Sequence, residues 1–97
     1  MKHHPTSAVT VQVTADTLTV ELSDGRSISV PLAWYPRLFA GTPAERTNWR
    51  LIGRGEGVHW PDLDEDISVA NLLGGARSGE SQQSLKEWIA ARPNKAV

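Results

Sequence analysis

The chain lacks cysteine and long apolar runs, and each absence excludes a class of function. None of the 97 residues is cysteine, so disulfides and thiolate metal sites are excluded. No stretch approaches the roughly 20 consecutive apolar residues that a membrane-spanning helix requires. Two histidines near the N-terminus precede no apolar run, so no signal peptide is predicted. We therefore expect a cytoplasmic protein with no membrane association.

An excess of basic residues is also missing. Lysine and arginine number 10 against 11 acidic residues, which gives a formal net charge of −1. Nucleic-acid binders draw much of their affinity from cations that neutralise phosphates, so direct nucleic-acid binding is not expected. What the chain does have is 39% hydrophobic residues and four tryptophans, enough for one small domain with a modest core.

Residues 9–30 show the alternation of apolar and polar side chains that is typical of β-strands. Asp24-Gly25 supplies the positive φ angles of a tight hairpin turn, and Ala15-Asp16 suits an earlier turn. The apolar positions expected on one face are Val9, Val11, Val13, Leu18, Val20, Leu22, Ile28 and Val30. The pattern predicts an antiparallel three-strand meander, whose edge strand could pair in a homodimer.

The middle of the chain contains only short elements. Pro36 either follows a short turn or begins a helix, and Thr42-Pro43-Ala44-Glu45 has the sequence of a capping box. Leu51-Ile52 and Val58–Trp60 could be short strands joined by Gly53–Gly57. This glycine-rich segment lacks the Gly-Lys-Ser/Thr ending of a phosphate-binding loop, so it is interpreted as a flexible turn.

The C-terminal part is predicted to be helical. Ser68 can cap a short helix over Val69–Leu73 that Gly74-Gly75 closes. After a polar linker, Ser81 or Ser84 begins a last helix with an apolar stripe. The stripe consists of Leu85, Trp88 and Ile89, and Pro93 ends the helix. This helix either covers the open face of the sheet or is loosely attached.

Together these patterns predict an α+β fold, with a three-strand β-meander, short helices and a C-terminal amphipathic helix. Residues 1–7 are expected to be a disordered N-terminal segment. Residues 8–75 form the single α+β core domain, and residues 76–97 form a polar linker and the C-terminal helix.

The most informative stretch is the acidic run from His59 to Asp66. Its four carboxylates lie within five residues, directly after a histidine, a tryptophan and a proline. Leu63 and Ile67 could anchor the segment while the acids face water. Three interpretations remain open: a solvated acidic loop, a metal site, or a contact surface for a basic partner.

The metal interpretation has a template against which it can be compared. Asp62, Asp64 and Asp66 match positions one, three and five of a calcium-binding loop, but Ile67 and Leu73 stand where glycine and glutamate are required. A transition-metal site of His59, Asp62 and Asp64 is an alternative, but one histidine with carboxylates is a weak signal. The serines lack the sequence of a nucleophile elbow. No metal, no cofactor and no enzymatic activity are predicted.

A surplus of acid beside an aromatic residue is typical of a docking surface for a cationic protein, because complementary charge orients and speeds association. The predicted docking edge comprises Trp60, Asp62, Asp64, Glu65 and Asp66. A second patch comprises Trp34, Tyr35 and Arg37.

An ordered series of motifs resembles the small bacterial family catalogued as domain of unknown function 2442. The resemblance covers roughly Val9 to Leu73, and residues 78–97 lie outside it. The motifs are Pro31-Leu32-Ala33-Trp34-Tyr35-Pro36-Arg37-Leu38, then Asn48-Trp49-Arg50-Leu51, then residues 55–68.

The resemblance implies a small α+β domain without established catalytic residues. Family members are commonly encoded beside another small uncharacterised protein, an arrangement similar to a toxin–antitoxin pair. It therefore implies a non-enzymatic, antitoxin-like protein-binding module whose partner is a small toxin-like protein encoded by the adjacent gene. Some members are fused to a helix-turn-helix domain, so the alternative is a small regulatory or ligand-binding domain linked to DNA through a partner or a dimer.

Overall fold

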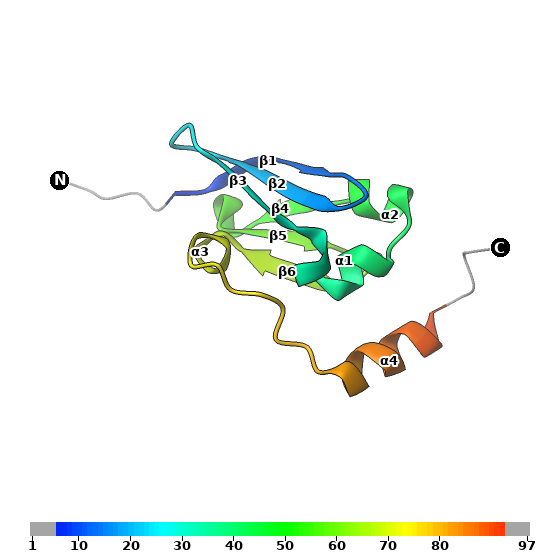
Figure 1. Ribbon diagram of the computed structural model, residues 1–97. Helices are drawn as coiled ribbons and strands as arrows, with labels where there is room; N and C mark the ends of the chain where they lie inside the picture. The colour runs from blue at the N-terminus through cyan, green and yellow to red at the C-terminus, as the bar shows by residue number, and fades with distance from the viewer. Residues whose placement is uncertain (1–5, 93–97) are drawn as a thin grey trace.

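The chain builds two three-stranded antiparallel sheets, with strand orders β1-β2-β3 and β4-β5-β6. The structure is a computed structural model and describes residues 6–92. The strands are β1 (Ala8–Val13), β2 (Thr17–Leu22), β3 (Ser27–Pro31), β4 (Arg50–Ile52), β5 (Gly57–Trp60) and β6 (Glu65–Ser68). The helices are α1 (Pro36–Ala40), α2 (Pro43–Thr47), α3 (Val69–Leu73) and α4 (Gln82–Ala91), with short 3₁₀ turns η1 (Leu32–Trp34) and η2 (Gly53–Gly55). The sheets lie one above the other, with the short helices at their margins (Figure 1).

The first sheet is the predicted meander. Its strands pair in register, with Leu18 opposite Val30 and Val20 opposite Ile28. Gly25 has φ +93°, as the predicted hairpin turn requires. The alternating side chains Leu18, Val20 and Leu22 are buried, so the period-two pattern is confirmed through β2 and β3.

One residue of the first strand departs from the pattern. The register of β1 against β2 shifts between Ala8 and Thr10, which is a β-bulge. The extra residue turns Ala8 inward and leaves Val9 56% exposed, while Val11 remains buried. The expectation that Val9 faces the core is therefore wrong, because a bulge reverses the side-chain alternation on one side of it.

The second sheet is only partly predictable from the sequence. The two short strands expected around the glycine-rich turn are present, but the acidic run also contributes a strand, β6. In the β5–β6 hairpin, Val58 pairs with Ile67 and Trp60 pairs with Glu65. Acidic residues are unfavourable in strands, so β6 could not be predicted from its composition.

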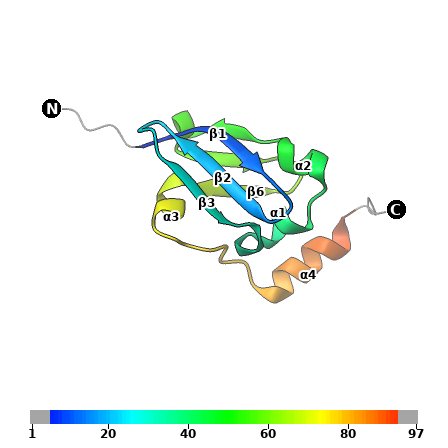
Figure 2. The same cartoon turned by 45° about the horizontal axis from the view of Figure 1, so that its top comes forward.

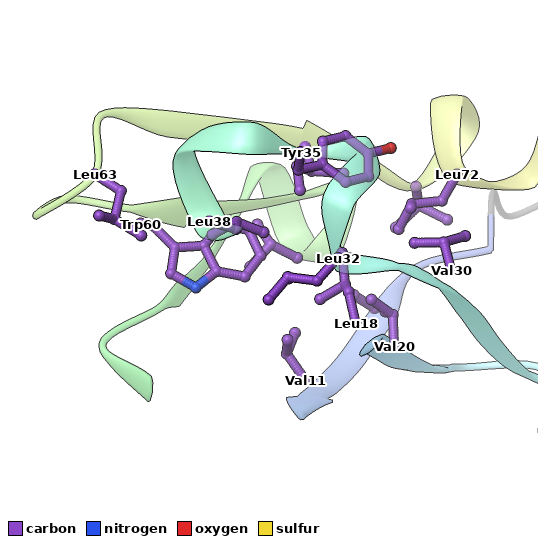
Figure 3. Packing of buried hydrophobic residues seen from close by; sticks show 14 of the residues in the cluster. Val11, Leu18, Val20, Val30, Leu32, Tyr35, Leu38, Trp60, Leu63 and Leu72 are labelled. Atoms are coloured by element: carbon purple, nitrogen blue, oxygen red, sulfur yellow. The ribbon is translucent and has the colours of Figure 1, made fainter. Parts of the chain in front are cut away.

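The hydrophobic core contains side chains from both sheets and from η1, α1 and α3. Figure 3 shows the Trp60 indole close to Leu38 and Leu63. All three side chains are fully buried. The indole Nε1–H donates a hydrogen bond to the Arg46 backbone oxygen at 3.0 Å, so the buried polar atom is satisfied and α2 is tied to the core.

The predicted helix starts are confirmed. Helix α1 begins at Pro36, with Tyr35 as its N-cap residue. Thr42 accepts from the Glu45 backbone N–H while the Glu45 carboxylate accepts from the Thr42 backbone N–H, which completes the capping box of α2. The Ser68 side chain caps α3.

Helix α4 projects beside α1 at the end of a connector, and it does not cover a sheet (Figures 1 and 2). Ser81, one of the two predicted starts, caps it. None of the helices within residues 6–92 is long and apolar enough to cross a lipid bilayer. Residues 1–5 and Pro93 lie outside the described residues, whereas Ser7 hydrogen-bonds to Ser23 beside the β2–β3 turn.

Candidate functional site

The acidic run forms the tip of the β5–β6 hairpin. Trp60 and Leu63 are fully buried and hold the two sides of the turn to the core. The Asp64 side chain is 86% exposed and the Asp66 side chain is 68% exposed. Asp64 also has a positive φ of 50°, a conformation that Asp tolerates better than most residues. A rigidly anchored turn therefore holds carboxylates out toward solvent.

Each exposed aspartate has a different neighbour. Asp62 Oδ2 accepts a hydrogen bond from the Asn48 side-chain amide at 2.9 Å. Asp64 Oδ2 lies 3.4 Å from Arg37 Nη1. Asp66 hydrogen-bonds to the ring of His59 across the outer face of the second sheet. The three carboxylates thus belong to three local contacts rather than to one.

The metal site considered for His59, Asp62 and Asp64 is not assembled. His59 binds Asp66 instead, and Asp62 and Asp64 bind Asn48 and Arg37. Within residues 6–92, no group of three or more His, Asp or Glu side chains is placed to hold a metal ion.

Two predicted docking residues are buried. Trp60 is 0% exposed and Tyr35 is 4% exposed. The pleat of β5 turns Trp60 toward the core, and Tyr35 packs in the same core cluster. Both rings are buried in this structure, so neither is exposed as predicted; only the Tyr35 hydroxyl reaches the C-terminal segment, where it donates to the Ala76 backbone oxygen.

Glu65 shares the inward face of the hairpin, because it is the register partner of Trp60. Its Oε2 atom is buried and has no hydrogen-bond partner among the described residues. Burial raises the pKa of this carboxyl from 4.5 to about 7, although the Asp66 backbone N–H and the charge of Arg37 act in the opposite direction. The Glu65 charge and burial together raise the pKa of Tyr35, with burial the larger cause.

Arg37 joins the acidic turn to the C-terminal part of the chain. Its guanidinium donates to Glu80 Oε1 at 2.8 Å and to Glu80 Oε2 at 2.6 Å, and its Nη1 donates to the Asp64 backbone oxygen at 3.1 Å. The Glu80 contact raises the pKa of Arg37, and Arg37 in turn lowers the pKa of Glu80.

An open cleft of about 430 Å³ lies around this arginine. It is lined by Arg37, Asp64, Glu65, Ser78, Gly79, Glu80 and Ser84. A smaller pocket of about 140 Å³ is lined in part by Tyr35 and Glu65. The structure thus brings Tyr35, Arg37, Asp64 and Glu65 together. Asp66 also lines the smaller pocket while it bonds to His59, and Asp62 bonds to Asn48.

Sequence reasoning missed the residues that meet this region from α2 and the C-terminal segment. Arg92 donates to Glu45 Oε1 at 2.7 Å, and the guanidinium carbons of Arg37 and Arg92 lie 4.8 and 4.7 Å from the centroid of the Trp88 ring. Glu45 was predicted only as a helix cap. The Glu45–Arg92 and Arg37–Trp88 pairs are separated by more than 40 residues and carry no local signal, whereas the four-residue spacing of Trp88 and Arg92 is a local signal of one helix face.

The fold and the site define a class: a small α+β domain of two stacked three-stranded sheets that displays an acidic hairpin turn. The site is equipped to form ion pairs and hydrogen bonds with a charged surface. Residues 8–78 match the family described as "Protein of unknown function (DUF2442)", and the chain belongs to this family.

Two solved structures are similar to this fold. One is a crystal structure of a protein of unknown function from Rhodospirillum rubrum, with a TM-score of 0.70, 21% identity, and coverage of 81% of this chain and 98% of that chain. The other is a solution structure of an uncharacterized protein from Chromobacterium violaceum, with a TM-score of 0.65, 23% identity, and coverage of 89% and 79%. At these identities the likeness shows the fold alone. No curated protein matches the sequence.

Proposed function

We propose that this chain is a non-enzymatic, antitoxin-like binding module for a small cytoplasmic protein with a basic surface. The acidic turn, defined as Asp62, Asp64 and Asp66 on the β5–β6 hairpin, is the docking edge. Trp60 and Leu63 serve as its internal anchors.

One observation carries the proposal: buried side chains fix the turn to the hydrophobic core, while exposed carboxylates give its outer surface a negative charge. The two anchors are fully buried, whereas Asp64 and Asp66 are mostly exposed. A preorganised surface loses little conformational entropy on binding, and single-sign charge attracts a partner of opposite sign. Each of the three carboxylates also makes one contact within the chain, yet Asp64 and Asp66 remain mostly exposed and can still face a partner.

The experiment begins with co-expression of this chain and the product of its neighbouring gene. We expect one stoichiometric complex that weakens as salt is added. The variant carries Asp62→Asn, Asp64→Asn and Asp66→Asn, and we expect its affinity at low salt to fall about 10- to 100-fold, as loss of three complementary charges implies.

A matched control separates local from general charge effects. Glu21→Gln, Glu56→Gln and Glu87→Gln remove the same charge from other elements, and we expect this variant to bind nearly as well as the natural chain. If the aspartate variant keeps its affinity at low salt, or if both variants lose it equally, the docking assignment to this turn is wrong.

A further inference from the structure

The C-terminal strap, defined as residues 76–92, lies against the surface formed by η1, α1 and α2. At its start, the Ala76 backbone oxygen accepts a hydrogen bond from Tyr35 Oη at 2.8 Å, and the Ser78 N–H donates to the Trp34 backbone oxygen at 3.0 Å. The Arg77 guanidinium carbon lies 4.8 Å from the centroid of the Trp34 ring. The strap therefore contacts all three residues of the second predicted patch.

Two ion pairs hold the strap farther along. Arg37 forms a two-bond contact with Glu80, and Arg92 pairs with Glu45. All four side chains are largely shielded from solvent. Charge-assisted hydrogen bonds in shielded positions are stronger and more specific than pairs in open water.

Trp88 lies between these ion pairs in the sequence of the strap. Both paired arginines place their guanidinium groups over its ring, at distances that favour cation–π attraction. The surface thus offers the Arg37 guanidinium to an acidic residue and the Glu45 carboxylate to an arginine. It also offers the Tyr35 hydroxyl as a donor to a backbone carbonyl. These are the groups of a peptide-binding site, and the strap satisfies each of them.

Apolar packing attaches the strap only in part, through Trp88, which is partly buried against the hydrophobic core. None of the α4 side chains is buried, and Ile89 is about half exposed. The connector between α3 and α4 contains Gly74, Gly75 and Gly79, all exposed. A helix of ten residues is only marginally stable alone, so α4 depends on the side-chain contacts described above. The family match ends at residue 78, ahead of the helix.

We infer that the strap-binding surface, defined as Trp34, Tyr35, Arg37 and Glu45, is a docking site for a helical segment, and that the strap is its built-in, displaceable occupant. The outside ligand is a partner segment of the same chemistry: an acidic residue ahead of a short helix that carries a tryptophan and an arginine. This inference goes beyond the proposed function, because docking at the acidic turn does not require it.

The test uses the full chain with a weakened strap and an unchanged surface. The variant carries Trp88→Ala and Arg92→Gln, and the probe is a fluorescent synthetic peptide of residues 76–92 with the natural sequence. We expect fluorescence anisotropy to show the peptide binding to this variant at least 10-fold more tightly than to the natural chain. In the natural chain the tethered strap competes at a high effective concentration.

Two controls define the comparison. Lys86→Ala, on the exposed side of α4, should leave peptide affinity as low as in the natural chain. A peptide that itself carries Trp88→Ala and Arg92→Gln should not bind the weakened chain. Glu80→Gln releases the strap at its other end, so it should also increase affinity for the natural peptide.

Failure to bind the peptide in both released variants, or equal affinity in the natural and released chains, would overturn the inference. Circular dichroism and the unfolding midpoint show whether each variant keeps its two sheets. The aspartate variant of the acidic turn is measured separately, so either idea can fail while the other stands.

Discussion

Glu65 is a carboxyl group on the buried face of β6, and it makes the stability of the protein depend on pH. Its folded-state pKa is about 7, compared with an ordinary value of 4.5. The folded state therefore holds this proton more tightly than the unfolded state does. The stabilising effect is complete below about pH 4.5 and is lost as the pH rises through about 7.

Glu65→Gln tests this linkage. The variant should be more stable than the natural chain at pH 8, because an amide carries no charge to bury. One pKa unit corresponds to about 1.4 kcal/mol, and partial access of water reduces the total, so we expect a gain of about 1–2 kcal/mol. Urea unfolding at pH 5, 6, 7 and 8 measures it.

Glu56→Gln, at an exposed carboxylate beside η2, is the control and should follow the pH profile of the natural chain. A Glu65→Gln variant that keeps the natural slope of stability between pH 5 and 7 would show that Glu65 does not titrate in this range.

At the scale of single elements, the turn η2 touches the first sheet through a glycine. Gly55 has φ +85°, and a Cβ atom built there would lie 2.7 Å from the Ala8 backbone oxygen. Gly25, in the β2–β3 hairpin, has φ +93° but no atom within 4 Å of such a Cβ. The two glycines therefore share the backbone requirement and differ in the space around them.

Alanine at each position separates these two effects. Gly25→Ala should cost about 1–2 kcal/mol, which is the strain of a left-handed backbone. Gly55→Ala should cost about 2–5 kcal/mol, because overpacking against β1 adds to the same strain. Chemical unfolding of both variants gives the difference. Equal losses would mean that β1 and η2 move apart freely.

The same elements show what one sequence can predict. The strands β2 and β3 alternate strictly, with Leu18, Val20 and Val30 buried as expected. The capping box of α2 and the serine caps of α3 and α4 were predictable because they depend on residues three positions apart. In β1, by contrast, the bulge at Val9 depends on pairing with a strand several residues away, and the local alternation contains no trace of it.

The acidic run was harder to interpret because its charged residues do not suggest the strand β6. Period two in β6 places Glu65 and Ile67 on one face and Asp66 on the other, but acidic residues score poorly as strand formers. Only tertiary pairing with β5 decides that Glu65 faces inward. Among the residues predicted for the site, the three aspartates are exposed, whereas Trp60 and Tyr35 are buried, and the sequence alone could not show this difference.

At the scale of the whole molecule, stability is distributed unevenly. Both sheets contribute to one hydrophobic core, whereas α4 has no fully buried side chain and adds only the partly buried Trp88. The molecule is elongated, with extents of 52 × 24 × 21 Å. Segments with few buried apolar contacts open at a lower free energy than the core does. The strap should therefore open as a separate unit.

Native-state hydrogen exchange measures this difference. We expect the amides of α4 to exchange through a local opening several kcal/mol below the global free energy of unfolding, and those of β2 to exchange near the global value. Arg92→Gln should lower protection in α4 and leave β2 unchanged, because it removes a contact of the strap with Glu45 and none within the sheets. Lys86→Ala should change neither. If α4 and β2 instead exchange with the same free energy in the natural chain, and Arg92→Gln lowers both, the strap and the core unfold as one cooperative unit.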